Sequence, residues 1–253
     1  MLSIDINCDM GEGFGVYKIG EDEEIIKYVT SANIACGFHA GDPTWMKNSV
    51  LLAEKNNVSI GAHPGYPDLI GFGRRNMEIS LSQIANDITY QIGALTAFTS
   101  AKKLQHIKPH GAMYNRAVND SDQAKSICEA IMSTQPDAIL LALSGSNWIK
   151  IADSMGIKVA NEVFADRALN PDGTLVSRSI EGSVISDISE VIDRSLRIIK
   201  EGKVEAIDGS LLSLEADSIC IHSDTSGASR IAKSLNEAFV SEGICIKSIS
   251  EIV

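Results

Sequence analysis

Four of the five histidines in this chain stand in short segments that directly follow apolar runs and contain glycine, proline or serine. The segments are NIACGFHAGD with His39, GAHPGYPD with His63, KPHGAMYN with His110 and CIHSD with His222. A single histidine is usually a core residue, but four in equivalent positions predict a shared pocket in which imidazoles bind or transfer protons. His106 differs because it lies inside an apolar run, and we expect it to be structural.

Acidic and amide side chains occur in an earlier segment, DINCDMGEGFG. Asp5, Asn7 and Asp9 alternate with apolar residues, so they share one face of a predicted strand. Their burial is unfavourable unless they bind a ligand or each other. Asn7 and Asp9 are therefore predicted site residues, whereas Asp5 belongs either to the site or to a hydrogen-bonded core. The GEGFG loop, which contains Glu12, lacks the GK[ST] ending of a P-loop and does not by itself predict phosphate binding.

Cationic side chains follow the same apolar runs. Lys108 precedes His110, Arg74 and Arg75 end the segment GFGRR, and Arg167 follows EVFAD. Carboxylates, imidazoles and cations together suit proton transfer and the binding of an anionic substrate that contains a carbonyl group. One of the two adjacent arginines is expected to bind a carboxylate.

Histidines and carboxylates are also ligands of divalent metals. The sequence contains no HExxH motif, and its five cysteines are scattered and never spaced as CxxC. We therefore expect neither a disulfide framework nor a tightly held zinc ion, and no residue is assigned as a metal ligand.

Short β-rich runs alternate with longer stretches of helical periodicity. Strands are predicted at residues 2–8, 32–36, 58–63, 105–108, 138–143, 158–163, 218–222 and 244–246. Helices are predicted at residues 22–28, 43–56, 81–103, 122–133, 148–155, 187–201 and 226–242. Asp42 before Pro43 is typical of a helix N-cap, so Asp42 is expected to cap a helix rather than to take part in catalysis.

This alternation predicts parallel strands joined by helical crossovers. The chemically distinctive residues follow several different strands, which favours a barrel with loops around one mouth over a doubly wound sheet. Because the eighth strand is weak, we predict an irregular seven-stranded (β/α) barrel that occupies residues 1–253 as one domain. The long polar segment 165–183 is predicted to be a functional loop.

Composition narrows the function classes. The formal net charge of −11 and the pI of about 4.9 argue against nucleic acid and anionic membrane surfaces as partners. The N-terminal segment MLSIDINCDM lacks the basic and apolar regions of a signal peptide. No apolar run approaches the ~18 residues of a membrane-spanning helix, so a cytoplasmic protein is expected.

The same segments carry a resemblance to the LamB/YcsF family. DINCDMGEGFG, NIACGFHAGDPTWM, GAHPGYPDLIGFGRR, KPHGAMYN, EVFADRA with NPDGTLVSR, and CIHSD occur in order along nearly the whole chain. The resemblance implies a (β/α) barrel similar to those of glycoside hydrolases and polysaccharide deacetylases. It implies ATP-dependent ring opening of 5-oxo-L-proline to L-glutamate, with 5-oxoprolinase subunits B and C as partners. ATP with Mg²⁺ is the implied cofactor, bound either by this chain or by the complex.

Two positions depart from the family pattern. Ser223 stands where glycine is usual, and Leu169 stands where an aromatic residue is usual. Either departure is expected to affect substrate fit without removing an ionisable group.

The implied reaction divides the candidate residues into two groups. Phosphorylation of the lactam oxygen would create a leaving group, after which the pocket needs a base for water, an acid for the ring nitrogen and cations for anionic groups. The predicted catalytic residues are Asp9 or His63 as base, with His39 and His110 as proton carriers or polarising donors. The predicted substrate-binding residues are Asn7, Glu12, Arg74, Arg75, Lys108, Arg167 and His222.

Two other functions are compatible with the sequence. One is a metal-dependent amidohydrolase or deacetylase that works alone, and the other is a non-catalytic subunit that only binds substrate. Turnover of 5-oxoproline without ATP or partners would favour the first, and full activity after removal of the histidines would favour the second.

Overall fold

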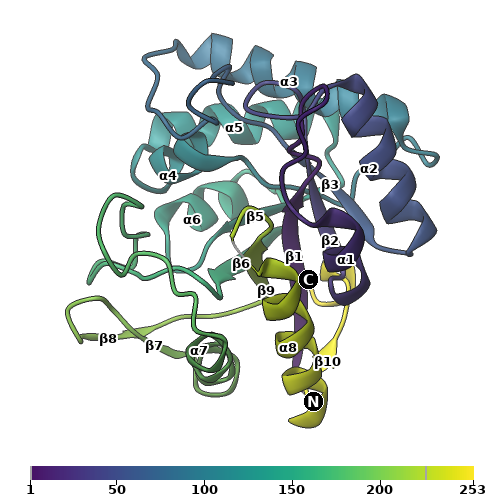
Figure 1. The fold of residues 1–253 in the computed structure, drawn as a ribbon. Helices are drawn as coiled ribbons and strands as arrows, with labels where there is room; N and C mark the ends of the chain where they lie inside the picture. Colours follow the sequence, from purple (N-terminus) through teal and green to yellow (C-terminus); the bar gives the residue numbers. More distant parts are fainter. Residues whose placement is uncertain (1, 226) are drawn as a thin grey trace.

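In a computed structural model that describes residues 2–225 and 227–253, seven parallel strands pair in a closed ring (Figure 1). Around the ring they are β1 (Ser3–Met10), β2 (Ser31–Ala35), β3 (Ser59–His63), β4 (His106–Ile107), β5 (Ile139–Leu143), β6 (Val159–Phe164) and β9 (Ser218–His222). Strand β9 pairs with both β6 and β1, which closes the barrel. The predicted seven-stranded (β/α) barrel is confirmed.

The weak eighth strand lies beside the ring. Strand β10 (Cys245–Ile246) pairs with Ser3 and Ile4 at the beginning of β1, whereas the later residues of β1 pair with β9. It therefore extends the sheet at the amino end of β1 and takes no part in closing the barrel.

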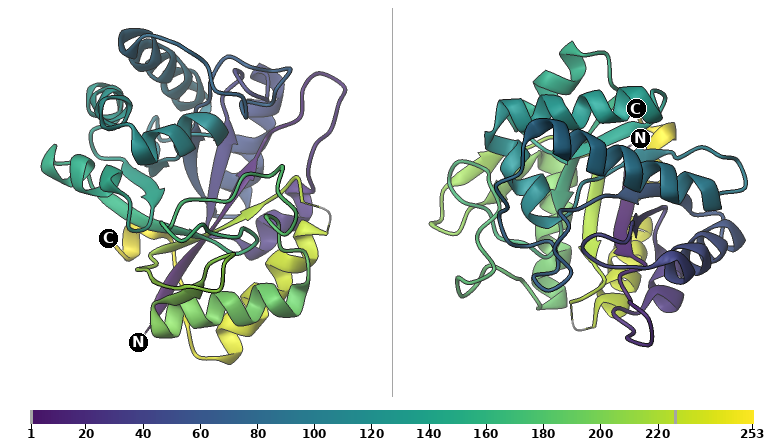
Figure 2. Two further views of the ribbon diagram at one scale, coloured as in Figure 1. Left: turned by 90° about the vertical axis from the view of Figure 1, so that its left-hand side faces the viewer. Right: turned by 90° about the horizontal axis from the view of Figure 1, so that it is seen from above.

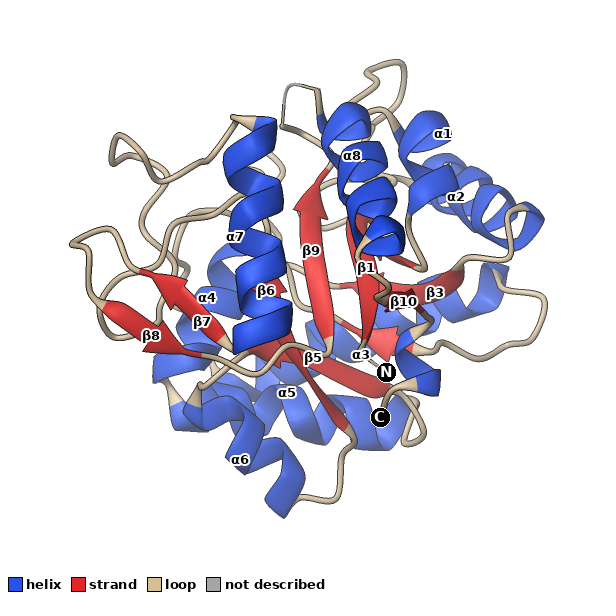
Figure 3. Cartoon of the chain, turned by 90° about the horizontal axis from the view of Figure 1, so that it is seen from below, coloured by secondary structure: helices blue, strands red, loops and turns tan. Residues whose placement is uncertain are grey.

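Helices surround the strands, as Figures 2 and 3 show from three further directions. They are α1 (Asp22–Ile25), α2 (Pro43–Lys55), α3 (Leu81–Phe98), α4 (Gly111–Asn119), α5 (Ser121–Thr134), α6 (Asn147–Ser154), α7 (Ile188–Glu201) and α8 (Ala228–Ser241), with 3₁₀ turns at Ile26–Tyr28 and Ile249–Glu251. The predicted cap of α2 is confirmed, because the Asp42 carboxylate accepts hydrogen bonds from the backbone N–H groups of Thr44 and Trp45.

Two helices differ from the prediction, and the start of a third lies outside the described residues. Helix α4 begins directly after His110, in a segment whose polar residues are more typical of a loop. Helix α3 ends at Phe98 rather than at residue 103, and Lys102 beyond it has a left-handed φ of 53°. The predicted start of the last helix, residue 226, lies outside the described residues.

The structure contains an antiparallel hairpin that was not predicted from the sequence. Strands β7 (Lys203–Glu205) and β8 (Leu211–Ser213) pair with each other between α7 and β9. Their residues are largely exposed, so the apolar pattern that identifies barrel strands is absent there.

The interior of the barrel is polar near the beginning of β1. All residues of β1 from Ile4 to Met10 are buried, and the Asp5 carboxylate accepts hydrogen bonds from the hydroxyls of Thr30 and Ser31 at 2.7 Å. Burial raises the pKa of Asp5 to about 6 despite these bonds. Asp5 is therefore part of a core network, which resolves the alternative left open by the sequence.

His106 is structural, as predicted. Its Nε2 lies 2.7 Å from Asn33 Oδ1 inside the barrel, and burial lowers its pKa to about 3. A Cβ added to Gly61 would lie 2.1 Å from the His106 ring, so the glycine makes room for this histidine. Within the described part of the chain, no helix is both long and apolar enough to span a membrane.

Candidate active site

A cleft of about 500 Å³ opens at the carboxyl ends of the barrel strands. Its charged and imidazole lining consists of Asp9, His63, Arg74, Lys108, His110, Arg167, Arg178 and His222. The loop at residues 165–183, which the sequence predicts to be functional, supplies one wall through residues 167 to 180.

The shared histidine pocket is present in the structure. His63, His110 and His222 line the cleft. His39 is 1% exposed and lies behind His110, with the two rings parallel and their centroids 3.8 Å apart. Three of the four predicted histidines therefore reach the cleft, and the fourth supports them from behind.

Lys108 connects the strands at the floor of the cleft. Its Nζ donates to Asp9 Oδ1 at 2.8 Å, lies 3.1 Å from Glu162 Oε1 and approaches Cys220 Sγ at 2.9 Å. Burial alone would lower the pKa of Lys108, but the charge of Asp9 and its other partners raise it well above its usual value. The buried partners of Lys108 therefore favour its charged form.

Asp9 is the ionised partner of this lysine. Its Oδ1 also accepts from Asn33 Nδ2 at 2.8 Å, and its Oδ2 lies 3.3 Å from His63 Nε2. Burial favours the neutral acid, but His63 and Lys108 outweigh it and hold the pKa of Asp9 well below its usual value. Such a carboxylate orients and balances positive charge better than it accepts a proton.

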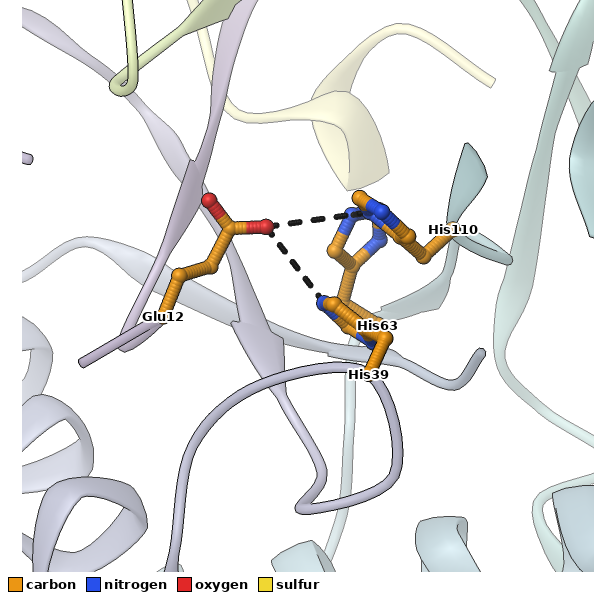
Figure 4. A group of neighbouring side chains, drawn as sticks. All are labelled: Glu12, His39, His63 and His110. Atoms are coloured by element: carbon orange, nitrogen blue, oxygen red, sulfur yellow. Dashed lines mark hydrogen bonds and ion pairs between the residues drawn. The ribbon is translucent and has the colours of Figure 1, made fainter. Parts of the chain in front are cut away.

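Glu12, His39, His63 and His110 form a second buried group beside the cleft, which we call the histidine cluster (Figure 4). Glu12 Oε1 lies 3.4 Å from His39 Nε2 and 3.7 Å from His110 Nδ1. Burial and the nearby charge of Asp9 raise the pKa of Glu12 well above its usual value. Burial lowers the pKa values of His39 and His110 well below the usual range.

Backbone carbonyl groups orient two of these rings. His63 Nδ1 donates to the carbonyl oxygen of Lys108 at 2.5 Å, and His110 Nε2 donates to that of Phe72 at 2.8 Å. His63 Nε2 and His110 Nδ1, the nitrogens that remain, lie 2.9 Å apart. The two backbone hydrogen bonds therefore turn His63 Nε2 and His110 Nδ1 toward each other.

Two glycines permit this close packing. A Cβ added to Gly73, whose φ is +63°, would lie 2.6 Å from His39 Cβ and 2.8 Å from His110 Cδ2. A Cβ on Gly65 would lie 2.7 Å from His39 Nδ1. The glycines that flank the histidine motifs therefore have a steric function.

A carboxylate orients the histidine on the other side of the cleft. His222 Nδ1 donates to Asp166 Oδ1 at 2.9 Å, and Thr225 Oγ1 donates to Asp166 Oδ2 at 3.2 Å. Burial favours the neutral acid, but His222 outweighs it and lowers the pKa of Asp166. Asp166 was not among the predicted site residues, although its place at the end of a predicted strand is the signal that could have identified it.

The arginines differ in their surroundings. Arg74 lines the cleft, pairs with Asp224 and lies 4.9 Å from the centre of the Phe72 ring. Arg167 is 5% exposed and donates through Nε to the carbonyl oxygen of Ser183 at 3.2 Å, so much of its role is to hold the 165–183 loop. Burial lowers the pKa of Arg167 to about 10.

Arg178 also lines the cleft, 4.0 Å from Asp224, and was not predicted as a site residue. Its distance from any strand in the sequence explains the omission.

Three of the predicted substrate-binding residues lie outside the lining of the cleft. Arg75 is outside the cleft lining, because its guanidinium is mostly exposed and pairs with the buried Asp68 carboxylate. Asn7 lies below the cleft, where its Nδ2 donates to Ser218 Oγ at 2.7 Å and to Glu162 Oε1 at 3.1 Å. Glu12 belongs to the histidine cluster and does not line the cleft.

Neither departure from the family pattern is part of the cleft lining. Ser223 is 3% exposed and packs against Gly20, since a Cβ on that glycine would lie 2.8 Å from Ser223 Oγ. Leu169 is 4% exposed and forms a backbone bridge with Leu175. The expected effect of these residues on substrate fit therefore has no support from direct contact.

Comparison with known proteins agrees with this architecture. The model of the LamB/YcsF family matches residues 4–253. The 5-oxoprolinase A subunit of Pyrococcus horikoshii is 49% identical over 254 residues, and that of Thermococcus sibiricus is 50% identical over 254 residues, with 100% of both chains covered in each case.

Solved structures with the same barrel fold were also found. The lactam utilization protein from Thermus thermophilus has a TM-score of 0.91 at 42% identity, over 98% of this chain and 100% of that chain. A family 4 carbohydrate esterase from Streptomyces lividans, at 8% identity and a TM-score of 0.51 over 97% of this chain and 91% of that chain, shares the fold. The motifs, the barrel and the full-length match lead to one conclusion: the chain belongs to the LamB/YcsF family.

Proposed function

We propose that this chain is the A subunit of a 5-oxoprolinase and that it opens the ring of 5-oxo-L-proline to give L-glutamate, in an ATP-dependent reaction with subunits B and C. Curated relatives that carry the name of the 5-oxoprolinase A subunit match it over its full length at about half identity. The observation that carries a catalytic role is the cleft in which the Asp166–His222 pair and the Lys108 cation meet.

A lactam resists water at neutral pH because resonance stabilises its amide. Transfer of a phosphoryl group from ATP to the lactam oxygen makes the ring carbon electrophilic. The oxygen of a water molecule then bonds to that carbon, the carbon–nitrogen bond breaks, and the ring nitrogen takes up a proton. A second water releases phosphate, so that ATP, 5-oxoproline and two waters give ADP, phosphate and glutamate.

His222 is the proposed base and proton carrier. Asp166 holds its Nδ1–H, which leaves Nε2 as the basic nitrogen of a histidine that lines the cleft. This nitrogen takes the proton from the attacking water and returns it to the ring nitrogen, in the manner of other carboxylate–histidine pairs. The sequence left Asp9 and His63 as alternatives, but Asp9 is committed to Lys108, and both nitrogens of His63 have close neighbours.

The cationic side chains of the cleft bind the anionic groups of the substrate and of the reacting centre. Lys108 stabilises the negative charge that develops on the oxygen of the reacting carbon. Arg74 and Arg178, which share Asp224 as a partner, bind the substrate carboxylate or the transferred phosphoryl group. ATP and Mg²⁺ are proposed to bind to the complex with subunits B and C rather than to this chain alone. Because ATP is consumed, the complex is proposed to work in the cytoplasm.

The test is reconstitution of the pure chain with 5-oxoproline, with and without ATP, Mg²⁺ and subunits B and C. Glutamate and inorganic phosphate are measured together. We expect glutamate only when ATP and both partners are present, at one phosphate for each glutamate. Absence of glutamate from the complete mixture would overturn the proposal.

A hydrolase that works alone is the second candidate, because the histidine cluster offers metal ligands beside the cleft. Glutamate formation without ATP or partners would support this candidate. A complex that stays fully active after His222→Gln would instead identify a subunit that only binds substrate.

A further inference from the structure

The histidine cluster contains buried polar atoms that the described protein leaves without partners. Glu12 Oε1 and both ring nitrogens of His39 have no hydrogen-bond partner among the described residues. Glu12 is 2% exposed and His39 is 1% exposed, so these atoms lie away from bulk solvent. Buried polar atoms of this kind are unfavourable unless something else satisfies them.

Two further nitrogens in the cluster face each other. The carbonyl groups of Lys108 and Phe72 accept the N–H groups of His63 Nδ1 and His110 Nε2. In neutral rings, the opposite nitrogens therefore present lone pairs, and they lie only 2.9 Å apart. Two lone pairs at this distance repel each other unless a cation lies between them. Carbonyl groups that fix the ring tautomer are also typical second partners of metal-bound histidines.

We propose that Glu12, His39, His63 and His110 bind one divalent transition-metal ion, for which zinc is the best match. The four ligand atoms lie within 4.8 Å of one another. Tetrahedral zinc with bonds of about 2.0–2.2 Å requires ligand atoms about 3.3–3.6 Å apart. The separations of 2.9, 3.4 and 3.7 Å in the cluster fall around that value. Imidazole nitrogens favour zinc over magnesium or calcium, which prefer oxygen ligands.

One ring has to adjust on binding. The rings of His39 and His110 are parallel, so a single ion cannot lie in the plane of both. His110 is held by its bond to Phe72, whereas His39 has no hydrogen bond within the described chain. Glu12, His63 and His110 therefore form the fixed part of the site, and His39 turns to complete it.

A second group of possible ligands is less suitable. Asp9, Cys220 and His222 also lie close together. The Lys108 ammonium lies 2.8 Å from Asp9 Oδ1 and 2.9 Å from Cys220 Sγ, so a positive charge already occupies this position. A metal ion would be repelled there, which leaves the histidine cluster as the site.

The site borders the cleft through His63 and His110. The proposal concerns binding alone and does not depend on the proposed reaction.

The test measures metal directly. The chain is dialysed against a chelator and titrated with Zn²⁺ in competition with a chromophoric chelator, and separately with Co²⁺ to record its visible absorption. We expect one equivalent to bind and a Co²⁺ spectrum typical of a four-coordinate nitrogen and oxygen site. Glu12→Gln, which keeps the side-chain shape, and His63→Ala should each weaken zinc binding at least roughly 100-fold, because even the outer partners of metal ligands contribute about 10- to 100-fold.

His222→Gln is the matched control, since it removes a histidine of the alternative cluster. It should bind zinc like the unmodified chain, and circular dichroism should show all three variants folded.

A shared proton on His63, next to Asp9, is the competing explanation for the close nitrogens. An unmodified chain that binds no zinc would support the proton and overturn the proposal. Loss of binding in His222→Gln, or its retention in both cluster variants, would overturn it as well.

Discussion

The two sides of the cleft satisfy their polar atoms in different ways. On the side of His222, the ring is paired with Asp166, and Arg167 donates to a backbone carbonyl group of the 165–183 loop. On the side of the histidine cluster, Glu12 and His39 carry buried atoms without hydrogen-bond partners in the described residues. The His222 ring is therefore held by a partner within the protein, whereas the unpaired atoms of the histidine cluster are those that the proposed ion would bind.

This difference separates two kinds of function. A paired histidine with one free nitrogen is suited to move a proton, because its orientation and tautomer are already set. Unpaired nitrogens and a carboxylate oxygen that converge are suited to hold a cation. Lys108 lies between the two sides and connects them through Asp9 and Glu162.

The largest effect is expected when this connection is removed. Lys108→Met leaves the carboxylates of Asp9 and Glu162 buried without their cation, which should lower the free energy of unfolding by about 3–5 kcal/mol. Denaturant titration measures this change. Lys103→Met removes an exposed pair with Asp137 at 3.7 Å and should change stability by less than about 1 kcal/mol. Equal effects of the two substitutions would show that the buried pairing is not important for stability.

A smaller effect is expected on the paired side. Asp166→Asn removes the charge that orients His222, and a charge-assisted hydrogen bond contributes about 1.5–3 kcal/mol. Glutamate release by the complete complex should therefore fall by roughly 10- to 100-fold, and the pH dependence of the rate should shift. An unchanged rate and pH profile would separate Asp166 from the reaction.

The smallest effect is expected at Arg75. Its guanidinium is mostly exposed and pairs with Asp68 outside the cleft, so Arg75→Met should leave glutamate release unchanged. Because Arg75 itself is exposed, its loss should lower stability much less than the loss of the buried Lys108 does. A large increase in KM for 5-oxoproline would support the prediction from the sequence that Arg75 binds substrate.

The barrel could be predicted because its strands are short apolar runs separated by periodic helices. The polar interior was harder to predict. Alternation correctly placed Asp5 and Asn7 inside, but only the contacts with Ser31 and Ser218 show that both belong to the core. Local sequence reports which face a side chain occupies and not how deep in the barrel it lies.

The site could be predicted in part for a similar reason. Histidines at strand ends predicted one pocket, yet the pairing of His222 with Asp166 joins residues from two strands and leaves no local pattern. The expectation of no tightly held zinc used spacing within single motifs. The histidine cluster draws its ligands from four separate segments, so spacing within one motif does not bear on it. That expectation remains a prediction, opposed by the metal site proposed above.

The most direct test of the account is glutamate release by a complex that contains His222→Gln. Loss of a proton-transfer group typically lowers the rate by about 10²–10⁴-fold. We therefore expect ATP-dependent glutamate release to fall by this factor, while circular dichroism, assembly with subunits B and C and zinc binding stay like those of the unmodified chain. A folded and assembled His222→Gln complex that releases glutamate at the unmodified rate would contradict the proposed role of the cleft.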